Sequence, residues 1–464
     1  MDSSSPPTKF QITGLASEEH MIGNVPDAVL THIISLLPPE QAVETRLVST
    51  RWKYIWTLLP TLHFEMPRVD KNSFLDFVEK TLNLRNGLPF QKFSINCSQN
   101  CNYDRVNASL RNVVNLGVQE LDLRFCDARK NVKLPWDALM SCKTLVCLTL
   151  GHAFVLDVPA EVCFPCLKVL HLRSVVYASD ASLRNLLSAC PVLEELYLRR
   201  YSFEEVDNLR TVNVSVPSLK RFKLRIDQLD VERHKSVRDS VLFEVSIDAP
   251  SLECLVLLDC VSGGNYYVKS LPSLREATID VRPSYRLELP DGWFYANCWL
   301  FSLLRSSQSV ETLTLSSSTL WALGLARQRC NLPKFANLVN LSLGLDKCHG
   351  WKLLPYLLES MPNLEVLALA DGLVPAHDAY RFIWTKPQHV PACLLFKLKT
   401  IEIRHFDARM KTAQLMFIEY LLMNAKVLET MQILCAEHLG PSMRKELLKL
   451  PRVSTSCQLN FVTL

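Results

Sequence analysis

The chain has 464 residues, 48% of them hydrophobic, and its 51 basic and 47 acidic side chains leave a formal net charge of +4. That length suggests two to four domains or one long repeat array, and the near-neutral charge argues against nucleic acid as a partner. No run approaches the roughly 18 apolar residues of a membrane span, so no membrane partner is expected, and 16 cysteines scattered behind an N-terminus without an apolar signal segment predict a reduced compartment, the cytoplasm and/or the nucleus.

The N-terminal region is predicted to begin with a flexible leader at residues 1–18 and to continue as short amphipathic helices up to about residue 60. The first helix starts near Pro26 and stops at Pro38, and a second begins near Glu40. Apolar residues recur at helical spacing at Val29, Leu30, Ile33, Ile34, Leu36 and Leu37. About 40 residues are too few for an independent core. The apolar residues therefore pack either on the rest of the chain or on a partner, and the pattern leaves both open.

From about residue 90 a motif of the form L-x-x-L-x-L is repeated in about twelve units. The last motif positions are 95, 123, 150, 172, 198, 224, 257, 279, 315, 343, 369 and 403. This motif and period are the signature of leucine-rich repeats, in which each unit buries its leucines by stacking on its neighbours. The sequence predicts an α/β solenoid: a curved parallel sheet with a helical or irregular convex side. A helical return is expected at residues 180–190, and loop insertions in the longer gaps.

One outward column of the predicted sheet is unusually basic. The residue after each L-x-L should lie at the strand end and face the concave side. In the first five full units, these residues are Arg124, Gly151, Arg173, Arg199 and Arg225. Stacked strands lie about 4.8 Å apart, and a guanidinium favours carboxylate and phosphate. We predict target binding here, through an acidic stripe on a target protein or an anionic small ligand. The alternative is solvated arginines that pair with Asp122, Glu120 and Glu195.

Catalytic and metal chemistry find little support in the sequence. Cys163 and Cys166 have C-x-x-C spacing, but no second pair or suitably spaced histidines accompany them, and we expect both to be buried structural residues. The histidines are scattered, with no nucleophile pattern near them. The sequence therefore predicts no catalytic residue, no metal and no cofactor.

The N-terminal segment resembles the F-box, the short helical motif that docks on the Skp-type adaptor of cullin–RING ubiquitin ligases. The ending Leu-x-Ser-x-Arg-Trp-Lys-x-x-Trp at residues 47–56 is typical of the plant version. Gly23, Val25 and Ala28 depart from the residues usual at the front of the motif. The match runs through Val25-Pro26-Asp27, Leu30, Ile33-Ile34, Leu36-Leu37-Pro38, Ala42-Val43 and Leu47 to Trp56.

The middle and the tail are similar to plant F-box/LRR proteins that end in an FBD module. Residues 142–145 and 188–194 are typical phrases of the divergent repeats, and residues 390–395, 424–429 and 451–461 match the FBD module. The resemblance implies an all-helical F-box at 19–65, leucine-rich repeats at 88–385, and an FBD domain with the last repeat(s) and a C-terminal cap at 386–464.

This resemblance implies a non-catalytic substrate-recognition subunit of an SCF-type ubiquitin ligase. The F-box would bind the Skp-type adaptor and, through it, cullin, while the repeats and the FBD region would bind an unknown target protein. The alternative is a repeat scaffold whose F-box does not engage a ligase. Trp56 could instead pack on the first repeat, and some of the other candidates will be internal core. The implied adaptor-binding residues are Pro26, Leu30, Ile33, Ile34, Leu36, Val43, Leu47, Trp52 and Trp56.

Overall fold

The computed structural model describes residues 25–37, 39–45, 52–55, 58–66, 71–84, 89, 91–97, 101–125, 132–140, 142–152, 154–201, 208–227, 244–259, 265–281, 298–326, 330–345, 348–370, 387, 389–406, 411–435 and 440–463. The chain forms two compact units, Met1–Arg124 and Phe125–Leu464. None of the helices in the described part is long and apolar enough to cross a membrane.

The first unit joins three short helices to the beginning of a parallel sheet. Its elements are α2 (Asp27–Ser35), α3 (Pro39–Glu44), α4 (Trp52–Ile55), β1 (Thr61–Glu65), α5 (Lys71–Leu84), β2 (Lys92–Cys97), α6 (Tyr103–Asn115) and β3 (Glu120–Phe125). The strands follow the order β1–β2–β3. Helix α5 buries Leu75, Val78 and Leu82, which lie three to four residues apart and so share one face of the helix. The strand motif predicted at 90–95 is β2, whereas β1 has no counterpart among the predicted units.

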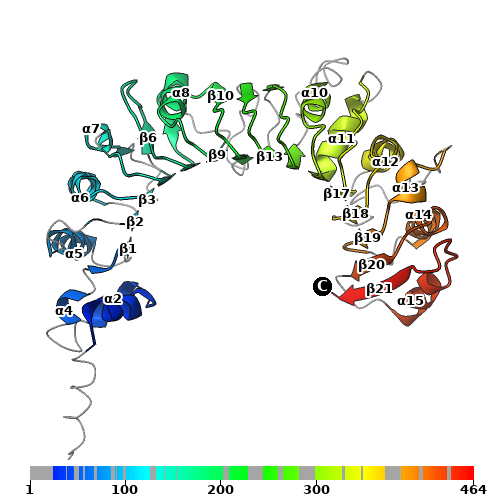
Figure 1. The fold of residues 1–464 in the computed structure, drawn as a ribbon, viewed down its shortest axis with the longest axis horizontal. Helices are drawn as coiled ribbons and strands as arrows, with labels where there is room; N and C mark the ends of the chain where they lie inside the picture. Colours follow the sequence, from blue (N-terminus) through cyan, green and yellow to red (C-terminus); the bar gives the residue numbers. More distant parts are fainter. Residues whose placement is uncertain are drawn as a thin grey trace, which may run out of the picture. The chain divides into compact units, whose positions relative to one another are not determined.

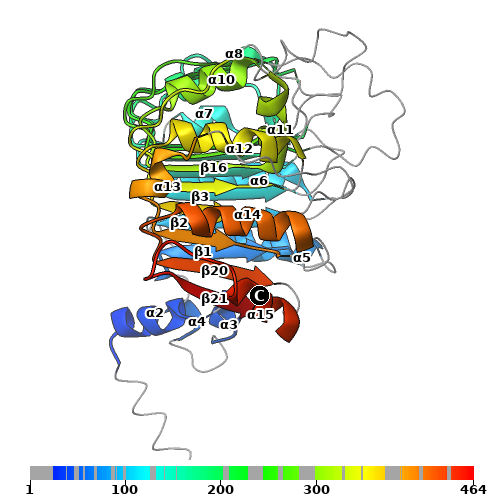
Figure 2. The ribbon, with the colours of Figure 1, turned by 90° about the vertical axis from the view of Figure 1, so that its right-hand side faces the viewer.

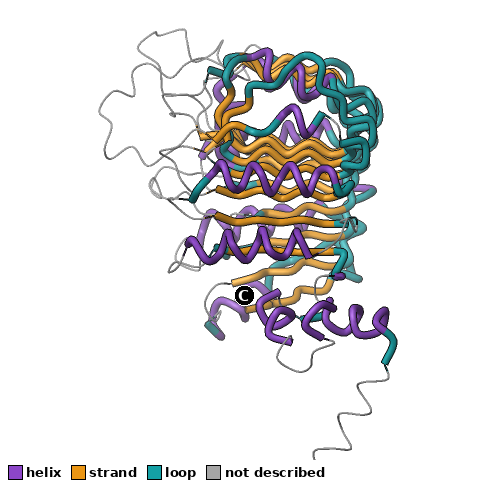
Figure 3. The backbone as a smooth tube through the Cα atoms, turned by 90° about the vertical axis from the view of Figure 1, so that its left-hand side faces the viewer, coloured by secondary structure: helices purple, strands orange, loops and turns teal. Residues whose placement is uncertain are grey.

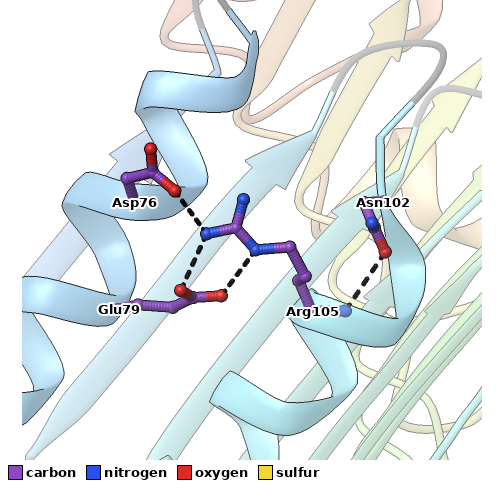
Figure 4. A network of polar contacts seen from close by, with 4 residues as sticks. All are labelled: Asp76, Glu79, Asn102 and Arg105. Atoms are coloured by element: carbon purple, nitrogen blue, oxygen red, sulfur yellow. Dashed lines mark hydrogen bonds and ion pairs between the residues drawn. The ribbon is translucent and has the colours of Figure 1, made fainter.

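A charged network joins α5 to α6 (Figure 4). Arg105 on α6 donates from Nε and Nη2 to the two carboxylate oxygens of Glu79 on α5, at 2.8 and 2.7 Å, and from Nη2 to Asp76 at 2.6 Å. The hydrogen bond from Arg105 lowers the pKa of Glu79 below its ordinary value. The Asn102 side chain caps α6 by accepting from the Arg105 N–H at 3.3 Å. Arg105 therefore serves both the start of its own helix and the contact with the helix before it.

In the second unit, one long parallel sheet carries a return segment behind each strand (Figure 1). The sheet runs in the order β5–β7–β9–β11–β13–β15–β16–β17–β18–β19–β20–β21. Its strands are β5 (Cys147–Gly151), β7 (Val169–Arg173), β9 (Glu195–Tyr201), β11 (Arg221–Asp227), β13 (Cys254–Asp259), β15 (Glu276–Val281), β16 (Thr312–Leu315), β17 (Asn340–Leu343), β18 (Val366–Leu369), β19 (Thr400–Ile403), β20 (Thr430–Cys435) and β21 (Gln458–Thr463). Within this unit the strands line the inner side of the curve and the helices its outer side (Figure 1). All twelve predicted motifs, including the two in the first unit, end within a strand of the structure, and β20 and β21 extend the sheet beyond them.

The repeat leucines form a continuous core because their strands stack in register. The stacked strands can be followed in Figure 2. Leu148 lies opposite Leu170, and Leu196 opposite Phe222. These four residues, like the inward residues of the later strands, are essentially inaccessible to solvent. Burial of a leucine stabilises the fold by about 1.5–3 kcal/mol, and a repeat gains this only when both neighbouring repeats are in place. The leucine spacing thus specifies the solenoid.

The return segments of the second unit are short strands and helices, which Figure 3 colours separately. One small sheet has the order β4–β6–β8 and another β10–β12–β14. The strands are β4 (Val132–Lys133), β6 (Phe154–Leu156), β8 (Val176–Tyr177), β10 (Thr211–Ser215), β12 (Glu244–Asp248) and β14 (Asn265–Val268). The helices are α7 (Trp136–Leu139), α8 (Asp180–Ser188), α10 (Cys298–Ser306), α11 (Ser317–Ala326), α12 (Cys348–Ser360), α13 (Ala392–Phe396), α14 (Lys411–Asn424) and α15 (Pro441–Leu448). Helices α7 and α8 lie among the short strands of the early repeats, and from α10 onward the described return segments are helices.

These two small sheets are a departure from the helical or irregular convex side that the motif predicts. The segments Thr211–Ser215 and Glu244–Asp248 alternate valine or isoleucine with polar residues, and this pattern favours a strand. On β14, Tyr266 is fully buried, stacks on Trp299 with ring centroids 4.4 Å apart, and donates to Asp259 at 2.7 Å. Helix α8 confirms the return predicted at residues 180–190.

Charges of alternating sign stand just before the strands, and we call this row the alternating-charge ladder. Its members, in order, are Lys168, Glu194, Lys220, Glu253, Arg275, Glu311, the uncharged Val339, Glu365, Lys399 and Glu429. Each backbone N–H donates to the carbonyl of the preceding member at 2.8–2.9 Å. The Glu194 carboxylate bridges Lys168 and Lys220 at 3.3 and 3.0 Å, and the hydrogen bond from Lys220 is the larger cause of its lowered pKa. Exposed pairs of this kind contribute little stability, but they favour this order of neighbours.

Candidate binding surfaces

Helix α2 exposes a row of large apolar side chains. Leu36 is 73% exposed, Val29 46%, Ile33 45% and Leu37 36%. Val29 and Ile33 are four residues apart and share one side of α2, and Leu36 and Leu37 follow directly after the helix ends at Ser35. Sequence reasoning selected Ile33 and Leu36 but omitted Val29 and Leu37, although all four belong to the same periodic pattern. We call these four residues the α2 face.

The opposite side of α2 holds Leu30 and Ile34, which are buried within the first unit. Helix α2 packs on α3 and α4, where Ala42 and Ile55 are also buried. Leu30 and Ile34, both in the predicted adaptor-binding set, thus contribute to the internal core of the helical segment. The structure thus distinguishes the residues that pack in the core of the segment from those exposed to a partner, which the sequence pattern did not do.

The remaining predicted adaptor-binding residues are described only in part. Pro26 is exposed and precedes α2, where its carbonyl accepts from the N–H groups of the first turn. Trp52 begins α4 and is half-buried. Leu47 and Trp56 lie outside the described residues, and so does the side chain of Val43 in α3.

In the second unit, the predicted basic column lies on neighbouring strands in register. Gly151 pairs with Arg173, Arg173 with Arg199, and Arg199 with Arg225. Arg124, the first member by sequence, belongs to the first unit and donates to Asp122 at 3.0 and 2.7 Å. The pairing that the sequence offered as an alternative therefore holds for Arg124.

Two arginines of the column share one carboxylate that sequence reasoning missed. Asp227 accepts from Arg199 at 2.8 Å and from Arg225 at 2.7 Å. Burial raises the pKa of Asp227, but the hydrogen bonds from Arg225 and Arg199 outweigh it and hold the pKa below its ordinary value. Asp227 stands two residues after Arg225 on the same strand, and alternation alone could have placed both on one face.

Glu195, which the sequence offered as a partner for the column, instead holds two other side chains. It accepts from His171 at 2.8 Å and from Arg221 at 2.8 Å. Burial acts to raise its pKa, but the hydrogen bonds from Arg221 and His171 lower it overall. Glu195 and Asp227 on the outward side of these strands thus each accept hydrogen bonds from two side chains.

Tyr197 on β9 lies between two cations from the neighbouring strands. The Arg173 guanidinium carbon is 5.5 Å from the ring centroid and the Lys223 ammonium 5.2 Å. The His171 ring meets the same tyrosine edge-on, with centroids 5.8 Å apart. Arg173 takes no carboxylate partner among the described residues, and its Nε is buried without an acceptor.

The prediction that Cys163 and Cys166 are buried is wrong, because both are exposed. Cys166 lies in the turn before β7, whose inward positions are filled by Phe164 and Leu167. Within the described part of the chain, no three His, Cys, Asp or Glu side chains are arranged to hold a metal ion.

Three family models match successive parts of the sequence. The F-box domain matches residues 22–64, the LRR repeats of FBD-associated F-box protein At5g56370 match 106–279, and the FBD matches 386–433. The putative FBD-associated F-box protein At3g50710 of Arabidopsis thaliana is 30% identical over 94% of this chain and 99% of its own length. The F-box/FBD/LRR-repeat protein At5g56420 of the same plant is 30% identical over 96% of this chain and 100% of its own. The chain belongs to the F-box/FBD/LRR-repeat family.

The F-box and FBD matches correspond to defined helices and strands of the structure. The F-box match covers α2, α3, α4 and most of β1. The FBD match covers α13, β19, α14 and the start of β20, so in this F-box/FBD/LRR-repeat protein the FBD region supplies further strands of the repeat sheet. Among solved structures, a chain in the complex of Rad7 and Elc1 in yeast is 16% identical with a TM-score of 0.23, covering 80% of this chain and 97% of that chain. A likeness of that size carries no argument.

Proposed function

We propose that this F-box/FBD/LRR-repeat protein is a substrate-recognition subunit of an SCF-type ubiquitin ligase. Its F-box binds a Skp-type adaptor and, through it, cullin, and its repeat sheet binds a target protein. Ubiquitin transfer is carried out by other subunits of the complex. The chain contributes by tethering, which turns a bimolecular encounter between target and ligase into an effectively intramolecular one.

The observation that carries this proposal is the exposed α2 face. Isolated exposed apolar residues are common, but four within nine residues, on α2 and directly after it, form a cluster of the kind that marks a protein interface. They lie within the region that matches the F-box. A large apolar side chain that is buried on binding contributes about 2 kcal/mol or more when it is an anchor, so loss of two anchors should abolish a micromolar complex.

The test is co-purification of a plant Skp-type adaptor with the full chain. Replacement of Ile33 and Leu36 by aspartate should remove the adaptor, because two charges would be buried at the contact. Ala28→Asp is the matched control, since Ala28 is exposed on the same helix and is not three or four residues from any member of the apolar row. The control should bind normally, and unchanged circular dichroism shows that the double variant is folded. Equal adaptor recovery from the double variant and the control would contradict the proposal.

The alternative function is a repeat scaffold whose F-box does not engage a ligase. Affinity purification from plant cells with the proteasome blocked separates the two. A receptor brings down adaptor and cullin together with targets, and the α2 variant loses adaptor and cullin while it keeps the targets. A scaffold brings down repeat-bound partners without adaptor in both cases.

A further inference from the structure

Strands β7, β9 and β11 present a surplus of positive charge on their outward side. Five basic side chains, namely Arg173, Arg199, Arg221, Lys223 and Arg225, face two carboxylates, Glu195 and Asp227. With His171 counted as neutral, these described side chains carry a net charge of +3. The two carboxylates are already engaged by Arg221 and His171, and by Arg199 and Arg225.

The net positive charge is concentrated at Tyr197. Arg173 and Lys223 flank this ring, and neither pairs with a carboxylate among the described residues. The Arg173 side chain is half-buried, and its Nε lacks an acceptor. A partly desolvated guanidinium without an anion is unfavourable, so an anionic group supplied from outside would be bound between these two cations.

The next strand offers a different surface. In register with Arg221, Lys223 and Arg225, strand β13 presents Cys254, Val256 and Leu258, all half-buried and uncharged. Tyr197 and Val256 are separated by two strand spacings, about 9.6 Å. An extended peptide rises about 3.3 Å per residue, so it covers this distance in about three residues.

We propose that the outward face of β7 to β13 binds an extended acidic segment of the target protein. A carboxylate of that segment lies between Arg173 and Lys223 beside Tyr197, and an apolar side chain about three residues away rests on Val256 and Leu258. This inference rests on the proposed receptor function and specifies the chemistry of its target. Arg199 and Arg225, which Asp227 holds, contribute positive potential without a direct contact.

A carboxylate fits this position better than a phosphate. Glu195 stands two residues before Tyr197 on the same face of β9 and bonds His171, which itself contacts the tyrosine. A dianion beside Tyr197 would be repelled by that carboxylate more strongly than a monoanion would be. The two flanking cations are singly charged and reach Tyr197 from the strands on either side, so a carboxylate beside the ring can accept from one of them and lie in the positive potential of the other.

The test measures fluorescence anisotropy of dye-labelled peptide pools with the full chain, co-purified with its adaptor if one is bound. Each pool fixes one glutamate and one leucine at a defined separation and leaves the other positions degenerate. Affinity should be highest at a separation of about three residues and should fall when glutamine replaces the glutamate. Arg173→Gln together with Lys223→Gln should weaken binding roughly ten- to hundredfold, the range for loss of charge-assisted hydrogen bonds. Lys269→Gln is the matched control, because Lys269 pairs with Asp248 on the separate small sheet.

Three outcomes would overturn the inference. They are equal affinity of the glutamate and glutamine pools, equal affinity of the double variant and the control, and preference for phosphoserine pools with efficient competition by inorganic phosphate. The receptor proposal fails separately, because it depends on adaptor recovery through the α2 face. A chain that binds the acidic peptides but no adaptor would keep this inference as the specificity of a scaffold.

Discussion

The α2 face and the outward face of β7 to β13 around Tyr197, here called the Tyr197 surface, would bind their partners through opposite kinds of chemistry. The α2 face presents four exposed apolar side chains on one helix and directly after it, and complementary burial of that area is non-directional and nearly independent of salt. The Tyr197 surface presents fixed charges whose carboxylate partners are already taken, and it selects by sign and geometry. A constant partner suits the first kind of surface, and a partner chosen among many suits the second.

The largest expected difference lies within α2 itself. Leu30→Asp buries an unpaired charge in the helical core and should lower the free energy of unfolding by about 4 kcal/mol or more. Ile33→Asp changes an exposed residue and should alter it by no more than about 0.5 kcal/mol, while it weakens adaptor binding. Urea unfolding of both variants, followed by circular dichroism, makes the measurement. Similar stability for the two would mean that the sides of α2 are not divided between core and contact.

The second-largest expected difference is in how strongly salt weakens binding at the two surfaces. Between roughly 0.1 and 1 M salt, screening shortens from about 10 to 3 Å, and acidic-peptide affinity should fall about tenfold. Adaptor affinity should change much less. Parallel titrations by anisotropy and by calorimetry test this, and equal salt dependence would argue that charge also governs the adaptor contact.

A smaller effect should follow from release of the two arginines that Asp227 holds. Asp227→Asn raises the charge surplus from three to four and should tighten acidic-peptide binding a few-fold. The same change removes charge-assisted hydrogen bonds to Arg199 and Arg225 and should lower the free energy of unfolding by about 1 kcal/mol. Peptide anisotropy and urea unfolding of the one variant report both changes. Weaker peptide binding would show that the neutralised arginines help as positioned groups.

The smallest effect concerns acid stability of the second unit. The pKa of Glu195 is lowered in the folded chain, so its stabilising contribution is complete above its ordinary pKa of about 4.3. It should be lost progressively as the pH falls from there through the lowered folded value. Glu195→Gln should remove this part of the pH dependence, worth less than about 1 kcal/mol because the pair is partly exposed. The free energy of unfolding is measured at pH 7 and pH 3 for the variant and the parent chain. An equal loss of stability between the two pH values in both chains would contradict the assignment to Glu195.

The repeat sheet was predictable from sequence because its cause is local and periodic. Each leucine motif must point alternate residues inward, and every one of the twelve predicted motif ends falls in a strand. The division of α2 into a buried and an exposed side was not predictable, since Leu30 and Ile33 are equally apolar and only α3 and α4 decide which is covered. Sequence reasoning identified the basic column but missed Tyr197 and Asp227, which its arginines contact. Tyr197 gains its role from Arg173, His171 and Lys223 on other strands. Asp227 gains its role partly from Arg225 on its own strand and partly from Arg199, which is 28 residues away on another strand.

The alternating-charge ladder implies a parity rule for the length of the solenoid. Removal of the single repeat that carries Glu194 would set Lys168 beside Lys220, whereas removal of two would set Lys168 beside Glu253. Val339 fills a position where the alternation calls for a positive charge, and Glu365, Lys399 and Glu429 resume the sequence of signs beyond it. Loss of repeats in pairs would therefore keep the alternation of signs, whereas loss of one repeat would place like charges side by side.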